Sequence, residues 1–328
     1  NSFNNLIKMK IQILTAAREK VPDPPIHDFE RLPILFRKLG HDVDYIVKSE
    51  WSRFYLRYLK FKPDVIISVG PIAALPGFLK RIGLIKRALL VNDWTDYWTE
   101  TMGEKHGIAK IAFLEFYGIE KADIVVTSTI FNYDRARLLG KKAYYRQHGV
   151  DLDLEKVKDA KLEGKFKILY CGSQDNKMKR IEKLIDAVKG LECDLYLIGK
   201  PNPDLQKIAS KNVHFLGFIP PKEIPPYYKA ADIITMTMDS DGSLKLFEAF
   251  KVGKPLLALN GRISNILTHR ENAYLTPNLR EGLIELMKDK KLREYLSNNI
   301  KKMKTMTWEE VAKYYIEILE KELKLRKS

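Results

Sequence analysis

Short apolar segments rich in β-branched residues alternate with longer amphipathic segments along most of this sequence. That alternation is typical of parallel β-sheets built from βαβ units, because a helix after each strand returns the chain to the same end of the sheet. In the first half the pattern predicts six strands, at residues 10–15, 42–47, 65–69, 88–91, 124–127 and 143–146. In the second half it predicts six more, at residues 167–171, 194–198, 213–215, 233–238, 255–259 and 273–275.

The two sets of strands predict two doubly wound α/β domains. A chain of 328 residues is too long for one comfortable core, and the usual domain size favours two units of about 150 residues. We place the linker in the charged segment 151–165, and the domains at residues 1–155 and 156–306. Thr307 and Glu310 form a predicted capping box at the start of a last helix, residues 307–328, whose apolar stripe must pack on another element.

Composition narrows the class of protein. The chain has 57 Lys and Arg against 42 Asp and Glu, and the net charge of +15 favours anionic partners such as phosphates, acidic lipid headgroups or nucleic acid. No apolar run approaches the roughly 18 residues of a membrane-spanning helix, and residues 1–8 are too short and polar for a signal peptide. The two cysteines, Cys171 and Cys193, show no metal-binding spacing. We therefore expect a cytoplasmic protein without a structural metal.

The segment 238–255 carries the clearest candidate chemistry. It runs from a predicted strand into a turn of small residues, then into a helix and a further strand, and ligands of open α/β sheets bind beyond such strand ends. Gly242 and Ser243 allow close backbone approach, and a helix beginning near Leu244 would direct its first N–H groups at a diphosphate. Glu248, one turn further, is placed to accept both hydroxyls of a ribose. The alternative is an ordinary strand–turn–helix with a solvent-facing glutamate.

Several short motifs along most of the chain resemble those of family 4 glycosyltransferases, which have the GT-B fold. They are Gly40-His41-Asp42-Val43, Ala122-Asp123-Ile124, His148-Gly149-Val150-Asp151, Tyr170-Cys171-Gly172-Ser173, Lys179-Arg180-Ile181, Ala230-Ala231-Asp232-Ile233, Lys245-Leu246-Phe247-Glu248 and Thr307-Trp308-Glu309-Glu310. The resemblance implies two Rossmann-like domains facing a cleft, with the last helix packed back on the first. Helices rich in Lys and Glu also resemble those of thermophilic, archaeal members.

The resemblance assigns the donor, a nucleotide-sugar, to the second domain. The implied donor-binding residues are Gly172, Ser173, Lys179, Ser240, Asp241, Gly242, Ser243, Leu244 and Glu248. Lys179 matches the lysine that binds the diphosphate in the family. The alternative is that Lys179 is a solvent-exposed basic residue at the start of a helix and binds no ligand.

Two positions depart from the family pattern. Ser240 stands where the family has a glutamate, with the neighbouring aspartates 239 and 241 as candidate substitutes. Ser173 stands where the family has an arginine, with Lys177 or Arg180 as substitutes for the guanidinium.

Asp93 and Asp96 are the candidate catalytic residues of the acceptor side. They follow the predicted fourth strand in the segment 92–100, where many relatives carry a His or an Asp-rich motif. Either carboxylate is suited to orient a sugar hydroxyl or to stabilise an oxocarbenium-like transition state, and Trp94 or Trp98 to stack on a sugar. The alternative is structural, with an aspartate capping a helix and both tryptophans packed.

The family's chemistry implies a retaining transfer of a hexosyl or N-acetylhexosaminyl group. The donor would be UDP- or GDP-linked, and the acceptor a glycan or a lipid-linked molecule. The leaving diphosphate, held by helix N-termini and Lys179, assists acceptor deprotonation, so we expect no metal ion and no other cofactor. Asp239-Ser240-Asp241 spells the metal-binding motif of the other glycosyltransferase fold, but it follows a late strand, and we interpret it as coincidental.

The sequence also fits other interpretations. Residues 51–62 and 78–87 combine basic with large apolar side chains, and they predict either helices on an anionic membrane surface or ordinary helices packed on the sheet. Alternatives with the same fold are a nucleotide-sugar epimerase, a glycan phosphorylase or a protein without transferase activity. A nucleic-acid-binding protein rests on charge alone, without a reading helix, an RNP motif or a zinc site, so we expect no nucleic-acid partner.

Overall fold

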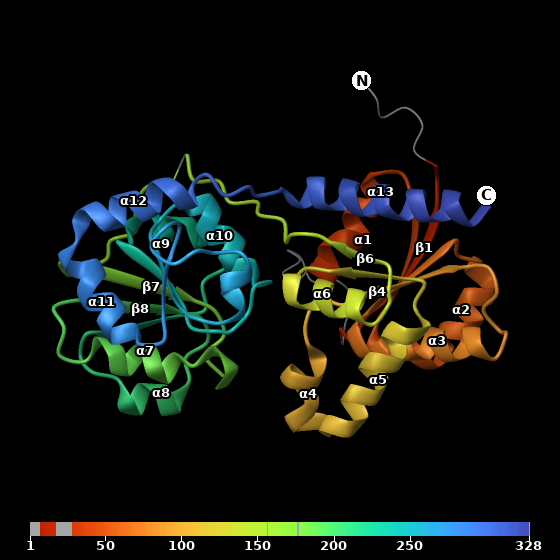
Figure 1. Ribbon diagram of the computed structural model, residues 1–328, viewed down its shortest axis with the longest axis horizontal. Helices are drawn as coiled ribbons and strands as arrows, with labels where there is room; N and C mark the ends of the chain where they lie inside the picture. The colour runs from red at the N-terminus through yellow and green to blue at the C-terminus, as the bar shows by residue number, and fades with distance from the viewer. Residues whose placement is uncertain (1–6, 18–27, 156, 176, 328) are drawn as a thin grey trace. The chain divides into compact units, whose positions relative to one another are not determined.

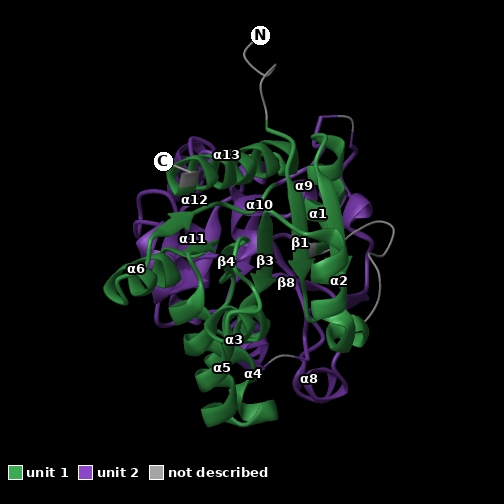
Figure 2. Cartoon of the chain, turned by 90° about the vertical axis from the view of Figure 1, so that its right-hand side faces the viewer, with its two compact units in different colours: residues 1–149, 306–328 green, residues 150–305 purple. Residues whose placement is uncertain are grey.

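The computed structural model describes residues 7–17, 28–155, 157–175 and 177–327. The chain divides into two compact units: Asn1–Gly149 with Met306–Ser328 form unit 1, and Val150–Thr305 form unit 2 (Figure 2). The first boundary lies after Gly149 and not after residue 155, because Val150 and Leu152 already pack into a hydrophobic core of unit 2.

Unit 1 is built on a six-stranded sheet with the order β2-β1-β3-β4-β5-β6 (Figure 1). Its strands are β1 (Lys10–Leu14), β2 (Asp42–Ile46), β3 (Val65–Val69), β4 (Leu89–Asp93), β5 (Ile124–Thr127) and β6 (Ala143–Tyr145). All neighbouring pairs are parallel. The predicted strands of the first half are confirmed, with small differences at their ends.

The helices of unit 1 surround this sheet. They are α1 (Asp28–Lys38), α2 (Phe54–Phe61), α3 (Ala74–Arg81), α4 (Trp98–His106), α5 (Ile108–Lys121), α6 (Ile130–Leu138) and α13 (Trp308–Lys327), with short 3-10 segments η1 (Lys48–Arg53) and η2 (Gly70–Ala73). Helix α5 lies directly on the start of α3, because a Cβ on Gly118 would come within 2.9 Å of the Ala73 side chain. In Figures 1 and 2, α3 and α5 lie together, away from α13.

Unit 2 repeats the design with a second parallel sheet, whose order is β12-β11-β10-β7-β8-β9. Its strands are β7 (Lys167–Cys171), β8 (Asp194–Ile198), β9 (Val213–Gly217), β10 (Ile233–Met236), β11 (Leu256–Leu259) and β12 (Tyr274–Thr276). Its helices are α7 (Ile181–Val188), α8 (Pro203–Ile208), α9 (Pro225–Ala230), α10 (Leu244–Val252), α11 (Leu279–Lys288) and α12 (Lys290–Ile300), with η3 (Lys177–Lys179), η4 (Pro221–Glu223) and η5 (Arg262–Asn265). The second set of predicted strands is therefore also confirmed.

The strand order reverses once in each sheet, next to its first strand. In unit 1 the chain passes from β1 to β2 on one side and then to β3 on the other. In unit 2 it runs from β7 through β8 to β9 and then crosses to β10. Ligands of doubly wound sheets bind at this reversal, beyond the carboxyl ends of the two strands. The fold therefore marks one candidate site in each unit.

The last helix packs on unit 1, as the resemblance implied. Thr307 and Glu310 form the predicted capping box: the Glu310 carboxylate accepts from Thr307 N at 2.7 Å, and Thr307 Oγ1 accepts from Glu310 N at 3.2 Å. Trp308 is 3% exposed, and the backbone of Gly149 lies so close that an added Cβ would be 2.5 Å from Trp308 Cα. No helix among the described residues has the length and apolar character needed to cross a membrane.

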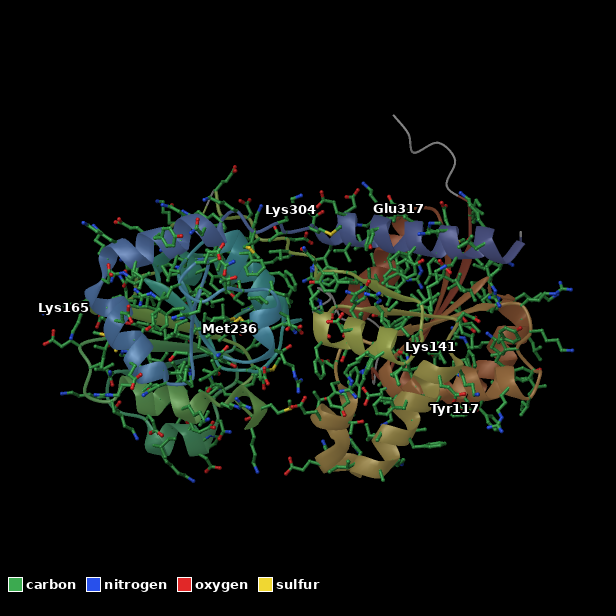
Figure 3. The ribbon with its side chains drawn as sticks, viewed as in Figure 1. Tyr117, Lys141, Lys165, Met236, Lys304 and Glu317 are labelled. Carbon is green, nitrogen blue, oxygen red and sulfur yellow. The ribbon has the colours of Figure 1, made fainter. Side chains whose placement is uncertain are left out.

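Replacement of Trp308 by alanine should destabilise unit 1. The indole lies beside the guanidinium of Arg31, 5.3 Å from the ring centre, and its removal leaves a cavity in a packed interface. Large-to-small changes of this kind cost about 3–5 kcal/mol. Thermal and urea unfolding of the full chain measure the change. Glu317→Ala, at an exposed position of the same helix (Figure 3), is the control, and an equal melting temperature for both variants would contradict the assigned role of α13.

Candidate functional site

The candidate donor site lies at the carboxyl ends of β7 and β10. The loop after β7 begins with Gly172 and leads through η3 into α7, and the loop after β10 leads through Gly242 into α10. A hydrogen bond joins the two loops, since the hydroxyl of Thr237 donates to the carbonyl of Lys179. The structure thus brings the two groups of predicted donor residues together within one unit.

The turn after β7 depends on a close approach between two glycines. Gly172 N donates to Ile198 O at 3.0 Å, and a Cβ on Gly199 would be 2.1 Å from Gly172 O. Gly199 also has a φ of +140°, which side chains rarely adopt. The buried Gln174 fastens the turn by donating to Gly199 O at 3.2 Å. Ser173 remains exposed at the edge of the site.

Lys179 is held at the junction between η3 and α7. The next residue, Arg180, has a φ of +50°, so the chain turns sharply before α7 begins. The bond from Thr237 fixes the backbone of Lys179 against the second loop, while its side chain is partly exposed. This placement suits a lysine that approaches an anion at the strand ends.

The first turn of α10 presents backbone N–H groups at the same edge. Ser243 occupies the cap position with extended backbone, and its side chain makes no capping hydrogen bond. Ser240 Oγ instead accepts from Gly242 N at 3.3 Å. Because the first N–H groups of a helix have no partner within the helix, this end is suited to bind phosphate oxygens.

Glu248 lies one turn inside α10 and is 8% exposed, so the alternative of a solvent-facing glutamate does not hold. Its carboxylate accepts from Tyr228 Oη at 2.6 Å and from Lys245 Nζ at 2.7 and 3.0 Å. Burial, with the Glu248 charge next, raises the pKa of Tyr228 well above its usual value, so this phenol stays a donor. Cys171 lies against the same group, and burial raises the pKa of its thiol, which therefore stays neutral.

The two aspartates beside Ser240 are held by η5. Asp239 Oδ1 accepts from Arg262 N at 2.5 Å, and Asp241 Oδ2 accepts from Asn265 Nδ2 at 2.8 Å. Asp241 is buried. Among the described residues, no group of three or more His, Cys, Asp or Glu side chains is arranged to hold a metal ion. In this arrangement Asp239 and Asp241 shape the loop after β10.

On the acceptor side, the structure separates the two predicted aspartates. Asp93 ends β4 and is buried, with its carboxylate 3.1 and 3.2 Å from Nη2 of the buried Arg146. Asp96, three residues on, is exposed. Asp93 therefore forms an ion pair with Arg146 in the core. Of the two predicted aspartates, only Asp96 lies at the surface, where a ligand could reach it.

The adjacent helix α4 is capped by a residue that the sequence did not indicate. Glu115, on α5 and 1% exposed, accepts from the backbone N of Trp98 and of Thr99, both at 2.8 Å. It also accepts from Trp94 Nε1 at 2.6 Å. Trp94 is fully buried, as the structural alternative for this segment expected. Glu115, Arg146 and Tyr228 were not predicted, because each acts on a partner distant in sequence.

The Asp93–Arg146 pair gives a testable stability effect. Arg146→Met leaves a buried carboxylate without its partner, which costs about 3–5 kcal/mol. We expect a lower melting temperature for unit 1 than in Arg137→Met, the same change at an exposed position. The double variant Asp93→Leu/Arg146→Met should recover much of the loss, because it removes both charges. A single variant as stable as the control would contradict a structural role for the pair.

Comparison with known proteins gives a family match within unit 2. Residues 165–289 match the family model described as "Glycosyl transferases group 1". No curated protein sequence matches the chain significantly. The matched segment contains β7 to α11 and therefore both loops of the candidate donor site.

Solved structures share the whole fold at low sequence identity. Sucrose-phosphate synthase from Thermosynechococcus elongatus has a TM-score of 0.77 and 14% identity, covering 97% of this chain and 100% of its own. HepE from Anabaena, solved with UDP and glucose, has a TM-score of 0.72 and 15% identity, covering 95% and 99%. A UDP-GlcNAc 2-epimerase from Neisseria meningitidis, bound to UDP-GlcNAc, has a TM-score of 0.55 and 14% identity, covering 95% and 100%. These likenesses confirm the predicted GT-B fold.

Proposed function

We propose that this chain, which contains a glycosyl transferases group 1 domain over residues 165–289, transfers a hexosyl or N-acetylhexosaminyl group from a UDP-sugar to an acceptor bound by unit 1. The observation that carries the donor assignment is the meeting of Lys179, the α10 N-terminus and Glu248 at the strand reversal of unit 2. UDP is chosen because HepE and the epimerase, which share the fold, were solved with UDP and with UDP-GlcNAc.

The donor would bind with its diphosphate at the start of α10. There the N–H groups of the first turn and the positive end of the helix dipole face the anion, and Lys179 adds a point charge from the opposite loop. The ribose hydroxyls would donate to Glu248, whose carboxylate is oriented by Tyr228 and Lys245. A carboxylate fixed in this way loses little conformational entropy when the ribose binds.

The proposed reaction retains the anomeric configuration. The acceptor oxygen forms a bond to the anomeric carbon on the face from which the diphosphate departs, while the bond between that carbon and the β-phosphate oxygen breaks. The acceptor proton passes to the departing phosphate, so UDP and the new glycoside are the products. The N-terminus of α10 and Lys179 would stabilise the charge that develops on the diphosphate. This scheme uses no metal ion.

We also propose that unit 1 lies on an anionic membrane surface. Helix α2 exposes Leu56 (69%) and Leu59 (48%), and the segment around the end of α3 exposes Phe78 (50%) and Ile82 (51%). Lysine and arginine alternate with these apolar side chains in both segments. Apolar residues that enter the headgroup region, together with basic residues, are typical of peripheral membrane binding. The acceptor would then be a glycan or a lipid-linked molecule at that surface.

Ligand affinity separates the two parts of the proposed donor site. A hydrogen bond to a charged group contributes about 1.5–3 kcal/mol, so Glu248→Gln should weaken both UDP and uridine by roughly 10- to 100-fold. Lys179→Met should weaken UDP and leave uridine unchanged, because it removes only a phosphate contact. Isothermal titration of both ligands measures these constants.

Matched controls test the location of the site. Glu182→Gln and Lys183→Met make the same chemical changes at exposed positions of α7 and should bind UDP like the wild type. Tyr228→Phe removes a neighbour of Glu248 but keeps the carboxylate, and it tests whether the effect of Glu248→Gln is only loss of packing. Equal UDP affinity in Glu248→Gln and Glu182→Gln would refute the ribose assignment.

Transferase and epimerase activity predict different products. The fold likeness to UDP-GlcNAc 2-epimerases makes epimerisation the second candidate. A transferase should release UDP from one member of a UDP-sugar panel only when an acceptor is supplied, and the product should keep the donor's anomeric configuration by NMR. Conversion of UDP-GlcNAc to its 2-epimer without an acceptor would replace the proposed function by epimerisation.

A further inference from the structure

A cavity of about 890 Å³ opens within unit 1 at the carboxyl ends of β1 and β3. Thr15, which follows β1, and Val69, the last residue of β3, both line it. The cavity therefore lies where the strand order of the first sheet reverses, the position at which doubly wound sheets bind ligands. Its size is within the range of small-molecule sites, which is roughly 300–1,000 Å³.

The walls of the cavity are almost entirely apolar. They come mainly from η1, η2, α3, α4 and α5, and their apolar members include Trp51, Leu75, Phe78, Trp98, Met102 and Leu114. Such a wall cannot satisfy the hydroxyl groups of a glycan, because a buried hydroxyl without a hydrogen bond is costly. The chemistry of the wall matches a hydrocarbon chain.

Specific interactions hold this wall in place. Trp51 Nε1 donates to Thr15 O at 3.0 Å, so the polar atom of the indole is bound to the end of β1. Gly70 has a φ of +71°, and an added Cβ would be 2.4 Å from Trp98 Nε1, so only glycine lets Trp98 pack on the end of β3. Glu115 fixes the start of α4, which carries Trp98 and Met102. The shape of the cavity is therefore fixed by the packing of unit 1.

Basic side chains surround the cavity. Lys48, Arg81, His106 and Lys110 belong to η1, α3, α4 and α5, and all four are exposed. No aspartate or glutamate is among the described residues that line the cavity. Lysine and arginine cations from three elements, with a histidine from a fourth, complement an anionic headgroup on a hydrocarbon chain.

The surface beside the cavity indicates how such a molecule would reach it. Phe78 and Phe113 line the cavity and are also 50% and 66% exposed, and Ile82 and Ile108 nearby along the chain are 51% and 64% exposed. In Figure 3 Tyr117, another lining residue, lies on α5, away from α13. Exposed aromatic and aliphatic residues among basic ones favour contact with an anionic bilayer. A chain could then pass from lipid into the cavity without crossing water.

We propose that this cavity binds the hydrocarbon chain of a phosphate-bearing lipid, with the phosphate among Lys48, Arg81, His106 and Lys110, and that this lipid is the acceptor. The assignment of the lipid as acceptor rests on the proposed transferase function, whereas the binding of the chain and its phosphate does not. The proposal selects the lipid-linked class from the two acceptor classes given above.

A series of alkyl phosphates tests the proposal directly. Octyl, decyl and dodecyl phosphate, each below its critical micelle concentration, are titrated into the full chain by calorimetry. Burial of each added methylene should tighten binding about fourfold. Dodecanol should bind at least fivefold more weakly than dodecyl phosphate, and dodecyltrimethylammonium more weakly still. Equal binding of all three twelve-carbon probes, or binding of inorganic phosphate as tight as that of dodecyl phosphate, would overturn the proposal.

Variants locate the binding within the cavity. Arg81→Gln and Lys110→Gln should each weaken dodecyl phosphate about fivefold, the contribution of one basic residue near an anionic surface. Lys105→Gln and Arg137→Gln, exposed residues that do not line the cavity, are the matched controls. Met102→Gln, of similar length but polar, should reduce the gain per methylene. Equal weakening by the control variants would assign binding to general surface charge and reject the cavity.

Two further readouts separate this proposal from the proposed function. UDP affinity, measured on the same variants, should be unchanged, because the donor site lies in unit 2. Alkyl phosphate binding without any sugar transfer would leave the cavity assignment standing and remove the transferase. Sugar transfer to a soluble glycan, with no binding of alkyl phosphates, would leave the transferase standing and refute the cavity assignment.

Discussion

The reversal of strand order beside the first strand of each sheet is the constraint on which both candidate sites depend. Parallel strands must be joined by crossover helices, and where successive crossovers pass to opposite faces, the loops at the two adjacent strand ends diverge. In unit 2 the turn at Gly172 and the start of α10 lie at this reversal. In unit 1 the same reversal, between β1 and β3, lies at a cavity lined by α3, α4, α5, η1 and η2. The same topology therefore gives a polar candidate site in unit 2 and an apolar one in unit 1. The two sites differ in the side chains that line them.

The strands and the donor loops were predictable because their signals are local. Short apolar runs between longer amphipathic segments predicted the twelve strands of the described residues, and the small residues before Leu244 indicated a helix start open to an anion. The partners of buried charges were not predictable. Arg146 lies 53 residues from Asp93, Glu115 lies 17 residues from Trp98, and Tyr228 lies 20 residues from Glu248. Only the folded sheet brings these groups together, so the sequence left Asp93 as a catalytic candidate that the structure places in a core ion pair.

The positions of the basic residues say more about the ligand than the total positive charge does. A net charge of +15 was compatible with phosphates, acidic lipids or nucleic acid. In unit 2, Lys179 lies at the edge where α10 begins, and in unit 1 four basic residues surround an apolar cavity. Both arrangements suit a phosphate group. In the proposals above, the phosphate bound by unit 2 belongs to a diphosphate between two loops, and the phosphate bound by unit 1 belongs to a lipid headgroup. The apolar walls behind the second group of basic residues favour a lipid over the hydrated backbone of a nucleic acid in the proposed assignment.

In the proposed donor site, the serine at position 240 would leave recognition of the donor sugar to other parts of the loop after β10. Its hydroxyl accepts from Gly242 N and so shapes the turn before α10. The flanking carboxylates of Asp239 and Asp241 bind Arg262 N and Asn265 Nδ2, and both ties fasten the loop to η5. A sugar that reaches this edge therefore meets a surface built jointly by residues 238–243 and η5. Donor preference in this chain should follow the position of η5, which two aspartates control, more than the identity of residue 240.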